Sequence, residues 1–167
     1  MESDVLVFGK AEFVHWLGHL SDDYPLRGVV SIGDPGSMAP EAIDTLRCPV
    51  LRLEFLDRYD ACAVDGKPGP SSVHVMALPG FARRLQGRTG AAVVHCDAGL
   101  SRGPTVAWLL GCLLAGPGSE VQQLSAVLAQ RPGADVNPWL VALAQRRLRQ
   151  FDLATAVSKL ASCGIRR

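Results

Sequence analysis

The fold of this chain is decided by residues 91–115, which read AAVVHCDAGLSRGPTVAWLLGCLLA. Ala91–His95 is a compact apolar run that predicts a buried strand, and Pro104–Ala115 predicts an apolar helix. The chain between them must turn from strand to helix within a few residues. Such a tight turn points successive backbone N–H groups into its concavity, and the helix adds its positive N-terminal end. The segment is therefore predicted to bind a tetrahedral oxyanion.

Side chains of this turn, which we call the anion loop (residues 96–102), suit that ligand. Arg102 can place a planar, bidentate donor on two anion oxygens. Cys96 lies in the same positive field, which favours the nucleophilic thiolate form at neutral pH. Gly99 suits a turn that needs an unusual backbone angle, and the Ser101 hydroxyl can hydrogen-bond within the loop. The nucleophile and the anion site thus belong to one segment.

The rest of the chain alternates short β-prone runs with segments of helical spacing. Predicted strands are Asp4–Phe8, Gly28–Ile32 and Pro49–Phe55. Predicted helices are Ala11–Leu20, Pro40–Leu46, Val73–Leu85 (broken or frayed near Pro79-Gly80), Ser119–Gln130, Pro138–Gln150 and Asp152–Leu160. This order predicts an α/β fold: a central, mostly parallel sheet flanked by helices, with a helical C-terminal third. The turn-rich segment Leu56–Ser72 is predicted to be a functional surface loop.

Composition limits the class of protein. The 167 residues, 48% hydrophobic and 20% charged, predict a single domain over residues 1–167 with a core at about 5–150. The net charge of +1 argues against nucleic acid as a partner. Glu2 and Asp4 argue against a signal peptide, and the longest uncharged stretch, Gly103–Ser119, is shorter than the ~20 apolar residues of a membrane span. We expect a cytoplasmic protein without a membrane partner.

Cysteine usage argues against a disulfide framework and against a metal site. The chain has 5 cysteines, an odd number, and they form no CxxC pair. A structural role is expected for all of them except Cys96, namely for Cys48, Cys62, Cys112 and Cys163. Cys62, in the turn-rich segment, is also a candidate for a disulfide with Cys96 under oxidation.

Around the anion loop, the chain resembles the cysteine-dependent phosphatases of the protein-tyrosine and dual-specificity superfamily. Among these it is most similar to the compact bacterial-type members. Val93–Arg102 matches the family signature of His-Cys, five residues and Arg, with Gly third among the five. The likeness extends upstream to Leu51–Asp57 and downstream to Arg131-Pro132 and Asn137-Pro138. Strand, loop and helix occur in the order that this chemistry requires.

The resemblance implies hydrolysis of phosphomonoesters without metal or other cofactor. Cys96 would form a phosphocysteine, while a loop aspartate acts as general acid and then as general base. Asp57 is the first choice for that aspartate, with Asp60 and Asp65 as alternatives on the same segment. The implied phosphate-binding residues are Cys96, Asp97, Ala98, Gly99, Leu100, Ser101 and Arg102.

Partners and supporting residues also follow from the resemblance. The substrate would be a phosphorylated protein, of the kind on which tyrosine or dual-specificity phosphatases act, or a small phosphomonoester. The sequence leaves the oligomeric state open. His95 would orient the anion loop. Asn137 is predicted to cap the helix that begins at Pro138, and the resemblance adds a role in bracing the loop.

One position departs from the family pattern. The family usually has Ser or Thr after its Arg, where a hydroxyl stabilises the departing thiolate, and this chain has Gly103. Capture of phosphate followed by slow hydrolysis of phosphocysteine is therefore expected, unless Thr105 partly substitutes. The departure keeps open a pseudophosphatase that binds phosphorylated partners with little turnover. The spacing from Cys96 to Arg102, together with an acid loop upstream, argues against a sulfur transferase or an arsenate reductase.

Overall fold

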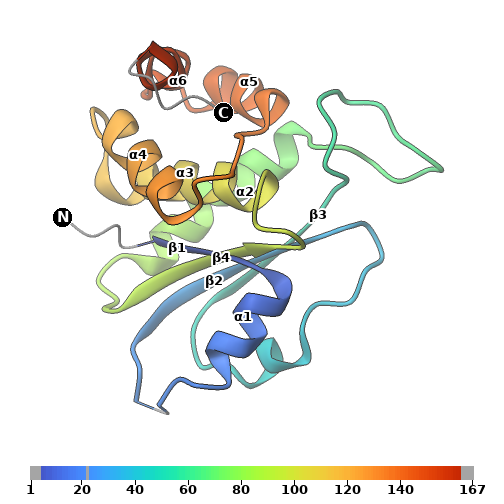
Figure 1. The fold of residues 1–167 in the computed structure, drawn as a ribbon, viewed down its shortest axis with the longest axis vertical. Helices are drawn as coiled ribbons and strands as arrows, with labels where there is room; N and C mark the ends of the chain where they lie inside the picture. The colour runs from blue at the N-terminus through green and yellow to red at the C-terminus, as the bar shows by residue number, and fades with distance from the viewer. Residues whose placement is uncertain (1–4, 22, 163–167) are drawn as a thin grey trace.

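A sheet of four parallel strands forms the centre of the described part of the molecule (Figure 1). The computed structural model describes residues 5–21 and 23–162, so Cys163 lies outside the described residues. The strands are β1 (Val5–Gly9), β2 (Leu26–Gly33), β3 (Val50–Glu54) and β4 (Ala91–Cys96). Their order is β1-β4-β2-β3, so the strand that leads to the anion loop lies inside the sheet.

Helices cover both faces of the sheet (Figure 1). The helix α1 (Lys10–Leu17) and the short 3-10 helix η1 (Glu41–Thr45) lie on one face. The other face carries α2 (Ser72–Leu85), α3 (Arg102–Ala115), α4 (Glu120–Gln130), α5 (Pro138–Arg147) and α6 (Leu153–Ser162). The predicted α/β fold with its helical C-terminal third is therefore confirmed. Within the described residues, no helix is both long and apolar enough to cross a membrane.

Apolar side chains fill the space on each side of the sheet. The larger cluster includes residues from Val5 to Leu160 and surrounds Trp108 of α3, which is fully buried. The indole N–H of Trp108 donates to the backbone oxygen of Glu120 at 2.9 Å, so burial of the ring leaves no unpaired donor. Phe13, Val29, Ile43 and Val93 form the smaller cluster, between the sheet and the α1 face. α3 is thereby fixed beneath the loop that precedes it.

The predicted break or fraying near Pro79-Gly80 is wrong, because α2 is continuous through Pro79. A proline inside a helix removes one backbone hydrogen bond and costs about 3 kcal/mol. Val75 and Leu78 before the proline and Phe81 after it are all buried in the larger cluster. Burial of a large apolar side chain contributes roughly 1.5–3 kcal/mol, so packing on both sides of the proline offsets its cost.

His95 joins the buried strand β4 to the smaller cluster. Its side chain is fully buried, and the imidazole stacks on the Phe13 ring with centroids 4.5 Å apart and 13° between the ring planes. Burial lowers the pKa of His95 to about 4. The ring is therefore neutral at pH 7, as its apolar neighbour requires.

We predict that the free energy of unfolding decreases as the pH falls from about 6.5 towards 4. In that window the unfolded chain binds a proton at His95 and the folded protein does not, so acid favours unfolding. Above about pH 6.5 the ring is neutral in both the folded and the unfolded state, so protonation of His95 no longer lowers the free energy of unfolding. The difference between a folded pKa of about 4 and an unfolded pKa of about 6.5 corresponds to roughly 3 kcal/mol. Urea titrations at a series of pH values measure it.

His95→Phe keeps an aromatic ring on Phe13 and removes the titrating group. Between pH 6.5 and 4, the free energy of unfolding of this variant should therefore fall less steeply with decreasing pH, by the equivalent of about one bound proton. His15→Gln is the matched control, because His15 is exposed. Equal pH slopes in wild type and His95→Phe would contradict the prediction.

Candidate active site

The anion loop connects the carboxyl end of β4 to the N-terminus of α3. The carboxyl ends of the neighbouring strands β1 and β2 lie on either side of β4. Cys96 lies at the base of the loop and is 3% exposed. The backbone N–H of Gly99 donates to its Sγ at 3.2 Å. The sulfur is thus covered by the loop and already accepts a backbone hydrogen bond.

Arg131, just after α4, holds the outer side of the loop. Its Nε donates to the Gly99 oxygen at 3.0 Å and its Nη2 donates to the Ala98 oxygen at 3.1 Å. Nη1 pairs with the Glu12 carboxylate of α1 at 2.7 Å. The Glu12 Oε2 also accepts from the Gly9 backbone, and that bond, together with Arg131, keeps the pKa of Glu12 below its usual value even though burial opposes it. One guanidinium therefore fixes two consecutive loop carbonyls.

Backbone donors and a threonine hydroxyl hold the other carbonyls of the loop. Lys10 N donates to Asp97 O at 2.9 Å, Asp135 N to Leu100 O at 2.9 Å, and Thr105 Oγ1 to Ser101 O at 2.8 Å. In a trans peptide the N–H points opposite to the C=O of the same unit. Because each carbonyl from residue 97 to residue 100 is held outside, the N–H groups of residues 98–101 face the inside of the loop. This is the cradle of donors that the sequence predicts.

Gly99 is required at the centre of the cradle. Its φ is +70°, and a Cβ built there would lie 2.6 Å from the backbone nitrogen of Gly9. Both the left-handed conformation and this close approach exclude an ordinary side chain.

Arg102 is held by groups at the ends of two other strands. Its side chain is 7% exposed. Nη1 donates to Asp34 Oδ1 at 2.7 Å and to the Phe55 oxygen at 2.8 Å, and Nη2 donates to Asp97 Oδ2 at 2.8 Å. Burial disfavours the charged guanidinium, but the hydrogen bond and the charge of Asp34, with those of Cys96 and Asp97, raise the pKa of Arg102.

Asp34 does not stand out in the sequence as a candidate site residue. Its surroundings, Gly33-Asp-Pro-Gly36, indicated only a turn at the end of a strand. Its position in the chain could have indicated a place in the site, because Asp34 directly follows β2 and the carboxyl ends of neighbouring parallel strands meet at one edge of the sheet.

Of the three candidate aspartates, the structure brings Asp57 to the anion loop. The Ser101 hydroxyl donates to Asp57 Oδ1 at 2.9 Å, and the Asn137 Nδ2 donates to the same oxygen at 3.0 Å. Asp60 instead forms two hydrogen bonds with Arg58 of its own segment, at 3.1 and 3.0 Å. Asp65 lies in an exposed turn next to the bridge between residues 64 and 67.

Asn137 connects the start of α5 to the site. Its Oδ1 accepts from the backbone of Trp139 and Leu140 at 3.1 and 3.0 Å, which caps the helix as predicted. Its backbone N–H donates to Thr105 Oγ1 at 2.8 Å, and that hydroxyl donates in turn to Ser101 O. The Thr105 hydroxyl is buried and already engaged on both sides, which argues against its replacing the hydroxyl that Gly103 lacks.

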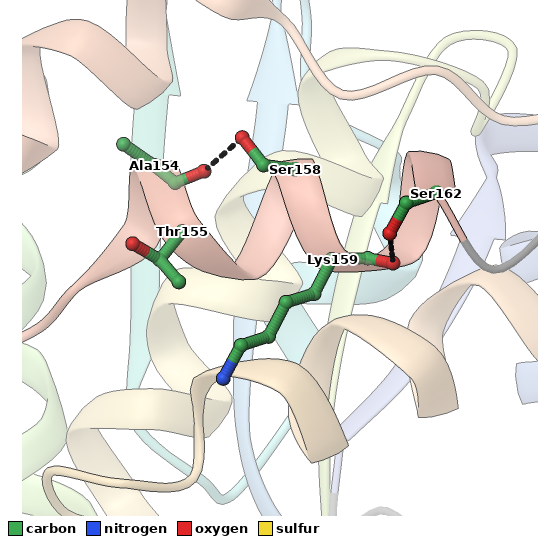
Figure 2. Close-up of a pocket in the computed structure, with 5 residues that line it drawn as sticks. All are labelled: Ala154, Thr155, Ser158, Lys159 and Ser162. Atoms are coloured by element: carbon green, nitrogen blue, oxygen red, sulfur yellow. Dashed lines mark hydrogen bonds between the residues drawn. The ribbon is translucent and has the colours of Figure 1, made fainter.

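Two hollows in the described part of the molecule lie away from the anion loop. One, of about 330 Å³, lies along α6. Figure 2 shows residues that line it, with Ser158 donating to the oxygen of Ala154 and Ser162 to that of Lys159. A larger hollow of about 850 Å³ lies between α1 and η1. Within residues 5–21 and 23–162, no three His, Cys, Asp or Glu side chains are grouped as metal ligands.

Solved structures with a similar fold indicate the fold class of the chain. No protein-family model and no curated protein sequence matches the chain. Human DUSP28 aligns at a TM-score of 0.61 and 17% identity, covering 86% of this chain and 90% of that one. A mouse putative dual specificity phosphatase aligns at 0.61 and 16%, covering 89% and 87%. The Yvh1 phosphatase domain from Chaetomium thermophilum aligns at 0.53 and 15%, covering 100% and 96%.

The chain therefore has the fold of the dual-specificity and tyrosine phosphatases. The resemblance inferred from residues 93–102 is confirmed at the level of the fold.

A substitution at Arg131 tests whether its hydrogen bonds hold the anion loop in the shape that binds an anion. Arg131→Lys keeps the positive charge but cannot span two carbonyls and Glu12 with a planar fork. We expect the dissociation constant for orthovanadate to rise about tenfold, since hydrogen bonds to charged groups contribute roughly 1.5–3 kcal/mol each. Isothermal titration calorimetry measures it.

Arg149→Lys serves as the control, because Arg149 is exposed beyond α5. Unchanged vanadate affinity in Arg131→Lys would show that the loop holds its shape without this anchor.

Proposed function

We propose that the protein hydrolyses phosphomonoesters without a metal ion, as a tyrosine or dual-specificity phosphatase acting through a phosphocysteine on Cys96. The observation that carries the proposal is the convergence of three groups on one loop. Cys96 lies beneath the cradle of N–H groups, Arg102 lies at its end, and Asp57 is hydrogen-bonded to it through Ser101. Nucleophile, anion donors and proton donor are the three parts that two-step phosphoryl transfer needs.

In the first step the Cys96 thiolate attacks phosphorus, so that a sulfur–phosphorus bond forms and the bond to the leaving oxygen breaks. Arg102 and the loop N–H groups hold the three remaining phosphoryl oxygens. Asp57 gives its proton to the leaving oxygen. Because Ser101 and Asn137 both donate to Oδ1 of Asp57, that proton belongs on Oδ2.

In the second step a water molecule attacks the phosphoryl group of phosphocysteine. Asp57, now a carboxylate, takes the proton from this water, the sulfur–phosphorus bond breaks, and Cys96 leaves as the thiolate. Inorganic phosphate is the product. The same aspartate thus acts first as acid and then as base, and the enzyme returns to its starting state.

Exposed apolar side chains near the site favour a phosphorylated protein side chain as substrate. Leu100 of the loop is 44% exposed, and Tyr59, two residues after Asp57, is 62% exposed. Such side chains suit the ring of a phosphotyrosine or an apolar peptide segment. Among the fold neighbours, PTPMT1 was solved in complex with PI(5)P. The loop of this chain carries no lysine, which argues against a polyanionic inositol headgroup here.

Gly103 supports the second candidate function, a phosphate-binding pseudophosphatase with little turnover. A Cβ built on residue 103 would lie 3.1 Å from Cys96 Sγ. A serine hydroxyl at this position would therefore be next to the sulfur, where it could stabilise the departing thiolate. The chain has no side chain there, so the second step is expected to be slow.

Hydrolysis of p-nitrophenyl phosphate in the presence of a chelator tests the principal proposal. Cys96→Ser should abolish turnover, since the phosphocysteine cannot form. Asp57→Asn should lower kcat by about 100-fold, the usual contribution of a positioned proton donor. Asp60→Asn is the matched control on the same segment and should leave kcat within twofold. Wild-type turnover in Cys96→Ser would refute the proposed mechanism.

Stopped-flow kinetics on the same substrate test the role assigned to Gly103. Wild type should show a burst of nitrophenol followed by a slow phase. Gly103→Ser should accelerate the slow phase at least tenfold, because a hydrogen bond to a charged sulfur contributes roughly 1.5–3 kcal/mol. Gly103→Ala adds the Cβ without the hydroxyl and should not accelerate it. If Ala and Ser give the same rate, the missing hydroxyl does not limit turnover.

A further inference from the structure

A positively charged surface lies where α2 and α5 meet. The Nε of Arg147, at the end of α5, donates to Ser72 Oγ in the first turn of α2 at 3.3 Å, so the two helices are neighbours there (Figure 1). We call the exposed arginines of both helices, with two exposed apolar residues of α2, the α2–α5 surface. Its residues are Val73, Met76, Arg83, Arg84, Arg146 and Arg147.

The α2 side chains of this surface form one stripe along the helix. With the α-helical rotation of about 100° per residue, positions 73, 76, 83 and 84 fall within about 100° of the helix circumference. From position 73 to position 84 the helix rises about 16 Å, which is the length of about five residues of extended chain. The stripe is therefore long enough for a short extended peptide segment.

The charge of this surface is not neutralised by carboxylates. α2 and α5 contain arginine but no Asp, Glu or Lys, and no acidic residue occurs in positions 66–96 or 136–151. Elsewhere Arg52, Arg58, Arg102 and Arg131 each pair with a carboxylate, whereas across residues 5–21 and 23–162 no arginine of α2 or α5 forms an ion pair. Because the net charge of the whole chain is only +1, positive charge is concentrated on this surface.

Apolar side chains accompany the arginines. Val73 is 76% exposed and Met76 is 49% exposed. Protein–protein interfaces are enriched in Met and Arg and depleted in Lys, Asp and Glu, and the α2–α5 surface has this composition. The flexible methionine side chain packs against partners of different shape. Such a surface is complementary to an acidic segment that also carries apolar side chains.

The first turn of α2 lies close to the candidate active site. The His74 ring contacts the Phe55 ring with centroids 4.7 Å apart, and the Phe55 oxygen accepts from Arg102 at 2.8 Å. Asp57 lies on the connection that leads from β3 into α2. A protein whose phosphorylated side chain enters the anion loop is therefore able to place a neighbouring segment on the α2–α5 surface.

We infer that the α2–α5 surface binds an acidic, partly apolar segment of the phosphorylated protein substrate, next to the phosphorylated residue. The inference rests on the proposed function and names the substrate class, which is phosphoproteins with acidic residues near the phosphorylated side chain. A second copy of this chain is disfavoured as the occupant, because a symmetric dimer across this surface places arginines opposite arginines. Anionic lipid offers the same negative charge, so vesicles form one arm of the test.

Phosphotyrosine peptides test the preference for acidic neighbours. In one pair of peptides, Glu and Leu residues precede or follow phosphotyrosine, and in the matched pair Gln replaces every Glu. At about 0.1 M NaCl the wild-type kcat/KM should be at least tenfold higher for the Glu peptides, mainly through KM. At about 1 M NaCl the preference should fall below threefold, because the Debye length shrinks from about 10 Å to about 3 Å.

Charge reversal on the surface tests where the preference arises. The double variant Arg146→Glu with Arg147→Glu should hydrolyse Glu and Gln peptides within twofold of each other, and its turnover of p-nitrophenyl phosphate should stay within twofold of wild type. Arg47→Glu with Arg88→Glu is the matched control, since both residues are exposed outside α2 and α5 and the net charge changes equally. This control should keep the preference. Urea unfolding confirms that each variant is folded.

Binding without catalysis separates this inference from the proposed function. In fluorescence anisotropy titrations, the unphosphorylated Glu peptide should bind wild type at least tenfold more tightly than the Arg146→Glu, Arg147→Glu variant. Vesicles of phosphatidylcholine and phosphatidylserine should sediment no more of the wild type than of this variant.

The inference is overturned if wild type does not distinguish Glu from Gln peptides, or if the control variant loses the preference as fully as the α2–α5 variant. It is also overturned if vesicles bind through these arginines and the peptide does not. Failure of the proposed function looks different: Cys96→Ser would then hydrolyse p-nitrophenyl phosphate as fast as wild type, whether or not the acidic peptide binds.

Discussion

The site depends on the outward direction of the loop carbonyls between β4 and α3. Four consecutive backbone oxygens, of residues 97–100, are bonded to Lys10 N, to Arg131 and to Asp135 N. Planar peptides convert this outward anchoring into a row of inward N–H groups, without any side chain having to enter the loop. The proposed anion site is prearranged in this way, so binding would not have to supply the free energy that ordering the loop costs.

The parallel sheet explains why these anchors come from distant parts of the chain. β4 lies between β1 and β2, so its carboxyl end is next to the starts of the segments that follow those strands. Lys10 and Glu12 follow β1, Asp34 follows β2, and Asp57 comes shortly after β3. These candidate site residues are thereby gathered at one edge of the sheet, and apolar clusters pack against both of its faces.

The α/β class and the strand-loop-helix unit could be predicted from the sequence because they follow from local patterns, and the resemblance to the phosphatase superfamily pointed to Asp57, which the structure places at the anion loop. The contacts of Asp34 and Arg131 could not be predicted, since they join residues far apart in the chain and depend on strand order. Strand order follows from the packing of whole layers, which local spacing does not encode. Continuity of α2 through Pro79 was missed for the same reason: tertiary burial outweighed a local helix-breaking signal.

Under the proposed mechanism, Cys96 carries the phosphoryl group between the two chemical steps. Mass spectrometry of protein quenched in alkali during turnover of p-nitrophenyl phosphate tests it most directly. We expect a phosphoryl adduct on the peptide that contains Cys96 in wild type, at higher occupancy than in Gly103→Ser. Turnover in wild type with no adduct on that peptide, in either protein, would contradict it.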